Sequence, residues 1–169
     1  MLFKFLLISM MATVLLFDEA FTYPWVKLNG NSPVCFGARG NQYGRFTYNR
    51  NIFARCFMLV HRSGSVTCNR NVRGHYSFWG CTPNNPNLCV VLTDQHNQPL
   101  APATVSHSGW YTLAGYTSSS SVLIFCVNKK PHCVFANSEL RLWYGEDLRG
   151  STEGDNSGRT CADVYGLLA

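Results

Sequence analysis

Five carboxylates gather in residues 141–165 of a chain that is basic overall, with a formal net charge of +5. Calcium takes about six to eight oxygen ligands, which carboxylates and backbone carbonyls can supply together. The spacing does not match an EF-hand loop. The simpler alternative is that these acids keep a loop soluble and pair with neighbouring arginines. We treat calcium as an optional ligand, not a required cofactor, with the candidate ligands Glu146, Asp147, Glu153 and Asp155; the fifth acid is Asp163.

A second cluster is basic. Residues 21–93 contain eight basic residues and no acid, and seven of the eight are arginines. The planar guanidinium suits two-point contact with sulfate, phosphate or carboxylate. Residues 61–81 combine three arginines with aromatic side chains, which favours a surface that binds glycans or polyanions. The alternatives are a solvated basic face and aromatic side chains that belong to a strand's core. The predicted binding residues are Arg62, Arg70, Arg73 and Trp79.

Signatures of catalysis are missing. The chain has no G-x-S-x-G elbow, no H-E-x-x-H motif and no glycine-rich phosphate loop. The even cysteine count argues against an unpaired cysteine nucleophile in a secreted protein. A Ser/His/Asp set could still assemble in space from distant segments. We predict that the protein is not an enzyme.

The elements that must position these residues are strands. Short apolar or alternating runs, rich in aromatic and β-branched residues, are separated by Gly, Pro, Asn and Ser. This pattern predicts an all-β fold, a single disulfide-stabilised antiparallel sandwich or jelly-roll-like domain. A turn is expected at residues 62–64, another at 96–99, and a loop at 145–159. The predicted strands are residues 43–48, 54–61, 65–68, 88–93, 122–127, 139–144 and 160–167.

Eight cysteines give the chain its other structural signal. In a secreted chain an even number indicates disulfides, here up to four, whose connectivity cannot be deduced from spacing. No C-x-x-C pair occurs, so zinc ligation is the weaker interpretation. The predicted disulfide-forming residues are Cys35, Cys56, Cys68, Cys81, Cys89, Cys126, Cys133 and Cys161.

The first residues resemble an export signal. Lys4 precedes an apolar run over residues 5–17, which is short for a membrane span. We predict a signal peptide at residues 1–20 and a single secreted β domain at 21–169; a membrane anchor is the alternative. No second apolar stretch of spanning length follows, so the mature chain is expected to lack a transmembrane segment. The expected location is extracellular, and no nucleic acid partner is expected.

Four blocks carry a family resemblance: LVHRSGSVTC (59–68), YSFWGC (76–81), RLWYGEDL (141–148) and DNSGRTCADVY (155–165). In this order they resemble a cysteine-containing secreted domain of cnidarian extracellular proteins, similar to coral skeletal organic matrix proteins. The resemblance covers nearly the whole chain after the signal. It implies an extracellular setting and association with matrix or mineral, and it supplies no catalytic residues.

Together these features predict a non-enzymatic secreted matrix or binding protein. Its basic half and acidic loop would contact glycans, polyanions or mineral, with extracellular matrix components as partners. The alternative is a secreted toxin or defence effector that acts on membranes or receptors. The sequence offers no amphipathic helix that could insert into a membrane.

Overall fold

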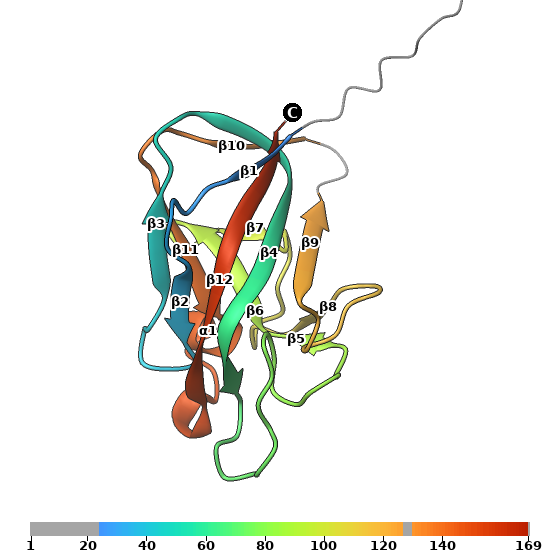
Figure 1. Cartoon of the computed structure of the whole chain (residues 1–169). Helices are drawn as coiled ribbons and strands as arrows, with labels where there is room; N and C mark the ends of the chain where they lie inside the picture. Colours follow the sequence, from blue (N-terminus) through green and yellow to red (C-terminus); the bar gives the residue numbers. More distant parts are fainter. Residues whose placement is uncertain (1–23, 127–129, 169) are drawn as a thin grey trace, which may run out of the picture.

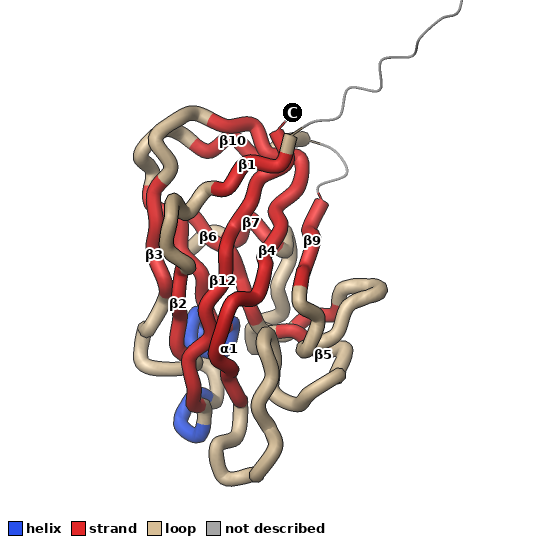
Figure 2. Tube along the Cα trace, in the orientation of Figure 1, coloured by secondary structure: helices blue, strands red, loops and turns tan. Residues whose placement is uncertain are grey.

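The computed structural model describes residues 24–126 and 130–168. Almost all of its regular structure is β, in antiparallel sheets, which confirms the predicted all-β class (Figures 1 and 2). The predicted signal peptide, residues 1–20, lies outside the described residues. No helix within 24–126 or 130–168 is long and apolar enough to cross a membrane.

The larger sheet, sheet A, is built around two long strands that run side by side, β12 and β4 (Figure 1). β1 and β2 pair with β12, whereas β9 and β10 pair with β4. The strands of sheet A are β1 (Trp25–Lys27), β2 (Val34–Gly37), β4 (Ile52–Thr67), β9 (Val122–Cys126), β10 (His132–Val134) and β12 (Ser157–Leu168).

The second sheet, sheet B, has the order β3-β11-β6-β7. A separate pair of very short strands, β5 and β8, lies outside both sheets. Their bounds are β3 (Gly44–Thr47), β5 (Asn87–Leu88), β6 (Val90–Asp94), β7 (Pro99–Ala101), β8 (Tyr111–Thr112) and β11 (Glu139–Tyr144).

The core forms between the two sheets. Alternate residues of β4, such as Phe57 and Leu59, point inward and are fully or almost fully buried. Leu92 of β6 and Leu142 of β11 are buried in the same cluster from sheet B. Each such side chain stabilises the fold by about 1.5–3 kcal/mol through removal from water. This packing is that of a β-sandwich.

β4 corrects one prediction. The turn expected at residues 62–64 does not form, and the two strands expected on either side are one continuous strand. Gly64 adopts a left-handed conformation (φ 78°), and a Cβ there would clash with the carbonyl oxygen of Arg159. Gly64 itself pairs with Thr160, and the pairing with β12 shifts register two residues earlier, where it leaves out Arg62. The segment therefore contains a β-bulge at Arg62 in place of the expected chain reversal.

The acidic segment corrects a second prediction. Residues 145–159 were expected to form a loop without regular structure, but they contain helix α1 (Gly145–Arg149) and the short 3₁₀ helix η1 (Glu153–Asp155). Gly150, at φ 61°, ends α1 in the left-handed conformation that glycine adopts readily.

Six cysteines form three disulfides, Cys35–Cys161, Cys56–Cys126 and Cys68–Cys81. The prediction is wrong for Cys89 and Cys133, which are free thiols. Cys89 is fully buried in the core, whereas Cys133 is exposed on β10, so the two thiols lie in opposite environments. Burial raises the pKa of the Cys89 thiol far above its usual range.

Candidate functional site

The predicted glycan or polyanion surface does not come together as expected. Trp79 is completely buried, and its indole Nε1–H donates to the carbonyl oxygen of Ser120 at 2.6 Å. It belongs to the core and cannot stack on a ligand, so the prediction is wrong for this residue. The alternative, that the aromatic residues of this segment serve the core, holds for Trp79.

Arg62 is engaged in an ion pair. Its Nε lies 2.5 Å from Oδ2 of Asp163, and Nζ of Lys27 lies 2.9 Å from Oδ1 of the same carboxylate. Burial alone would raise the pKa of Asp163, but hydrogen bonds from Lys27, Asn29 and Arg62 outweigh it and hold the pKa below its usual value. Arg62 therefore serves to neutralise a buried acid.

Arg70 and Arg73 are exposed to solvent, as Arg62 is, but neither forms an ion pair with another described residue. Arg70 is held by its backbone, since its N–H donates to the carbonyl oxygen of Asp155 at 2.8 Å. Polyanion binding by this pair stays a prediction.

The acidic residues hold the β2–β3 connection in place. The carboxylate of Asp147 accepts backbone N–H groups of Asn41 (2.8 Å) and Gln42 (3.1 Å), and Glu153 accepts that of Gly40 (2.8 Å). Burial raises the pKa of Asp147 to about 6, and the neighbouring Glu153 adds to the rise. These carboxylates act as acceptors for backbone donors that would otherwise lack partners.

Glu146 is buried beside them. Its Oε1 accepts the indole N–H of Trp110 at 2.9 Å and the hydroxyl of Thr152 at 3.0 Å, while Oε2 has no partner among the described residues. Within residues 24–126 and 130–168, no three His, Cys, Asp or Glu side chains are grouped to hold a metal ion. Calcium binding at Glu146, Asp147, Glu153 and Asp155 stays a prediction.

A different part of the molecule combines concavity, polar groups and an exposed aromatic ring. A cavity of about 360 Å³ opens where the β6–β7 loop faces β10 and the turn that follows it. We call it the loop pocket. Phe135, at its edge, is 66% exposed, which makes it the most exposed large apolar side chain of the described chain. The lining residues are Asp94, Gln95, His96, Leu100, Cys133, Val134, Phe135, Ser138 and Leu140.

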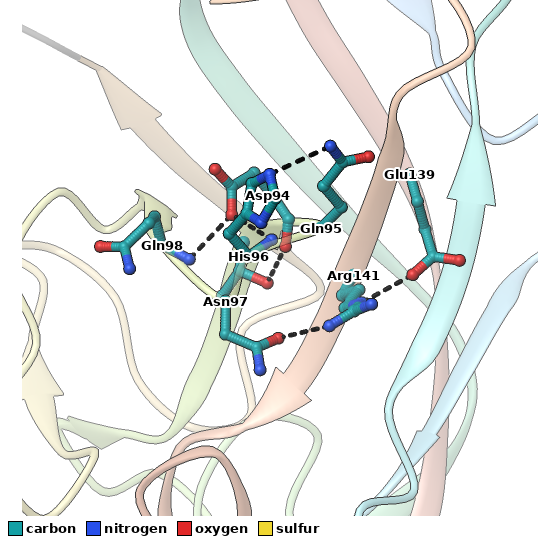
Figure 3. Close-up of polar contacts among 8 residues, drawn as sticks. Asp94, Gln95, His96, Asn97, Gln98, Glu139 and Arg141 are labelled. Carbon is teal, nitrogen blue, oxygen red and sulfur yellow. Dashed lines mark hydrogen bonds and ion pairs between the residues drawn. The ribbon is translucent and has the colours of Figure 1, made fainter.

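Hydrogen bonds hold the loop side of this pocket in place (Figure 3). Asp94 Oδ1 accepts the backbone N–H groups of His96 and Gln98, each at 2.8 Å. Asn97, at φ 60°, completes the turn, and its side-chain oxygen accepts from Nη1 of Arg141 at 2.8 Å. Because the backbone is fixed at both ends, the side chains of Gln95 and His96 are presented in defined positions. Oδ2 of Asp94 makes no hydrogen bond to another described residue.

The opposite side is equally constrained. The turn after β10 is held by the Ala136 N–H, which donates to Oδ1 of Asn51 at 2.7 Å, and by the Asn137 N–H, which donates to the carbonyl oxygen of Tyr48 at 2.7 Å. Phe135 therefore projects into solvent from a fixed backbone. An exposed aromatic ring and polar groups on a rigid frame can bind a small polar ligand with an apolar face.

A second cavity, of about 300 Å³, lies beside the Cys68–Cys81 disulfide and takes in part of the predicted segment. Its aromatic residue is Trp110, which is half-buried, packs against the core and is tied to Glu146. It therefore offers a less accessible ring than the loop pocket. Its lining residues are Cys68, Asn69, His75, Cys81, Thr82, Asn85, Asn87 and Trp110.

No local pattern in the sequence reveals the loop pocket. The residues 94–98 were available as a polar run between two predicted strands, but only as a turn signal. Nothing in the local pattern indicates that this turn meets the chain near Phe135, because that proximity comes from the packing of sheet A on sheet B.

Comparison with known proteins finds a cnidarian relative. No family model matches it, and no curated protein does. A solved structure, AJLec from the sea anemone Anthopleura japonica, matches with a TM-score of 0.77 and 37% sequence identity, over 86% of this chain and 98% of that one. The match agrees with the cnidarian setting that the resemblance implied and gives no link to coral skeletal matrix proteins. At this identity and coverage, the chain belongs to the same protein family as AJLec.

Proposed function

We propose that this protein is a secreted, non-enzymatic glycan-binding protein and that the loop pocket holds the sugar. AJLec is a lectin-like protein, as its name indicates, and the two chains share their fold over nearly all of its length. Three disulfides suit an oxidising, extracellular compartment. Neither a mineral role nor the toxin alternative draws support from this match.

The observation that carries the proposal is the placement of Phe135 beside the polar loop. A sugar ring has a face of C–H groups and a rim of hydroxyls. The exposed ring of Phe135 can cover such a face, while Gln95, His96 and Ser138 can exchange hydrogen bonds with the hydroxyls. The cavity volume of about 360 Å³ is within the range of small-molecule sites.

The free thiol of Cys133 lines the same pocket and provides a site for chemical labelling. A bulky maleimide on Cys133 should block sugar binding, and bound sugar should slow the labelling. Labelling that leaves sugar binding intact would place the sugar elsewhere.

The principal test is a pair of matched substitutions. Phe135→Ala removes the exposed ring of the pocket, whereas Phe53→Ala removes an almost equally exposed ring (57%) that does not line it. A glycan array first identifies a neutral saccharide that binds the wild type, and calorimetry then gives its Kd with each variant. We expect Phe135→Ala to weaken binding about tenfold or more, or about 1.4 kcal/mol, because the apolar contact is lost.

Phe53→Ala should change the Kd less than about twofold, within the small free energies typical of surface changes. Both side chains are exposed, so both variants should fold, which the melting temperature checks. Equal losses in the two variants would contradict the assignment of the pocket, and an array on which the wild type binds no glycan would contradict the function.

A further inference from the structure

A second concave region lies at the edge where β2 connects the two sheets. Two adjoining cavities, of about 330 and 410 Å³, share Cys35, Tyr43 and Arg159 and form one groove. β2 pairs with β12 of sheet A, while the chain beyond it returns as β3 of sheet B (Figure 1). We call this region the arginine groove; the residues used below are Asn29, Ser32, Gln42, Tyr43, Arg45 and Arg159.

The groove carries the positive charge of two arginines. Arg45 and Arg159 are both exposed, and neither forms an ion pair with another described residue. The carboxylates around them are already engaged. Asp163 is held by Lys27 and Arg62, and Glu139 lies 2.7 Å from Nε of Arg141.

The register between β3 and β11 increases this excess. Arg45 lies directly opposite Arg141, and like charges in such positions destabilise a sheet. Glu139 and Asn97 both contact Arg141, so Arg141 is compensated and Arg45 is left with its full charge. An anion in the groove would offset that repulsion.

The remaining walls are polar and fixed. The Tyr43 ring packs against that of Trp143, with centroids 4.4 Å apart, and the Arg141 guanidinium lies over the Tyr43 ring, 4.7 Å from its centroid. The disulfide Cys35–Cys161 ties β2 to β12 beneath it. Asn29 is fixed by its bonds to Ser32 and Asp163. Ser32 and Gln42 are exposed and can donate to ligand oxygens.

We propose that the arginine groove binds an anionic group, a sulfate or a carboxylate, carried on a saccharide. Arg45 and Arg159 would hold the anion through charge-assisted hydrogen bonds, and Tyr43 and Gln42 would contact the attached ring. This inference rests on the proposed glycan-binding function and extends it to acidic glycans. The surface predicted from the sequence, which includes Arg70 and Arg73, is the competing assignment for polyanion binding, and the test below distinguishes the two.

The test compares two double variants of exposed arginines. Arg45→Ala/Arg159→Ala removes the charge of the groove, and Arg70→Ala/Arg73→Ala removes the same charge elsewhere. The probes are a sulfated chondroitin tetrasaccharide, a hyaluronan tetrasaccharide that carries carboxylates only, and a neutral tetrasaccharide. For the wild type we expect the tightest binding to the sulfated probe, with an affinity that falls as salt rises.

The groove variant should weaken binding of the sulfated probe at least tenfold, and the control less than twofold. A weakening by Arg70→Ala/Arg73→Ala equal to or larger than that by the groove variant would overturn the proposal, as would equal binding of acidic and neutral probes. Binding of hyaluronan by the wild type shows whether a carboxylate alone suffices or a sulfate is required. Either result supports an anion site if the groove variant loses the binding of the acidic probes that the wild type binds.

Inorganic sulfate separates this inference from the proposed function. Titrated alone into ¹⁵N-labelled protein, it should shift the backbone amides of Tyr43 and Arg45, whether or not any neutral sugar binds. Sulfate-induced shifts without neutral-sugar binding would support the anion site in the groove and contradict sugar binding in the loop pocket. Neutral-sugar binding without sulfate-induced shifts would support sugar binding in the loop pocket and contradict the anion site in the groove.

Discussion

Because of Asp147, the free energy of unfolding should decrease as the pH rises from acid to neutral. This side chain is 4% exposed and accepts two backbone N–H groups from the β2–β3 connection. Burial raises its pKa from 3.8 to about 6, and Glu153 contributes to the rise. The folded protein therefore keeps a proton on Asp147 at pH values where the unfolded chain has released it.

The sign and size follow from proton linkage. Between about pH 4 and pH 6 the folded state binds more protons than the unfolded state, so the free energy of unfolding decreases as pH rises. The contribution is fully present below pH 4 and is lost above pH 6. A shift of about two pKa units corresponds to about 3 kcal/mol.

The assay is chemical denaturation of wild type and Asp147→Asn at several pH values from 4 to 7, in buffer with a calcium chelator. Asparagine does not titrate, so the free energy of unfolding of the variant minus that of the wild type should rise by about 3 kcal/mol across this range. Groups that do not interact with Asp147 titrate in both proteins and cancel, whereas the neighbouring Glu153 is tested by a variant of its own. The loss of one acceptor adds a constant offset of about 1 kcal/mol against the variant.

Glu153→Gln is the second arm. It keeps an acceptor for Gly40 and removes the neighbouring acid, so the pKa of Asp147 should fall and the pH dependence should become shallower. A difference between wild type and Asp147→Asn that stays constant from pH 4 to pH 7 would refute the reasoning.

Four further predictions concern residues singled out by the sequence. Trp79→Phe should lower the free energy of unfolding by about 1–3 kcal/mol, because the Ser120 carbonyl loses its donor and the core loses volume. Glycan affinity should stay unchanged. Weaker glycan binding at full stability would show that Trp79 belongs to the binding surface. Replacing both cysteines of the Cys35–Cys161 disulfide, which are 126 residues apart, should lower the free energy of unfolding by about 5 kcal/mol. Replacing those of Cys68–Cys81, which are 13 residues apart, should lower it by about 3 kcal/mol. Denaturation midpoints that rank the other way would contradict this order. A thiol reagent should modify Cys133 in the native protein and Cys89 only after unfolding, measured by mass, and native labelling of Cys89 would argue against its burial. Calcium at millimolar concentration should raise the melting temperature if Glu146, Asp147, Glu153 and Asp155 bind it, and an unchanged value would leave them as hydrogen-bond acceptors only.

The sequence predicts the strands well where alternation is regular. β11 has the bounds expected, and β9 and β12 differ by one to three residues at their ends. The Arg62-Ser63-Gly64 sequence predicts a turn because glycine at positive φ is common in turns, and only the pairing with β12 shows that the strand continues. α1 is too short for a periodic pattern to reveal.

The sites were harder to predict than the fold, for a physical reason. Residue type showed that arginines, acids and aromatic rings were present, but which of them face solvent depends on sheet packing. Trp79 fills the core although the sequence predicts it on a binding surface, and Arg62, which is exposed, is already paired with Asp163. Nothing in the sequence marks Phe135 as exposed, because phenylalanine is one of the residue types most often buried.

The central claim is that the loop pocket binds a glycan, and backbone amide shifts on titration with the array-selected neutral saccharide test it most directly. The account predicts concentration-dependent shifts of Gln95, His96, Phe135 and Ser138, with those of the cavity beside Cys68–Cys81 unchanged. Shifts confined to Asn69, His75 and Trp110, or none at saturating sugar, would contradict it.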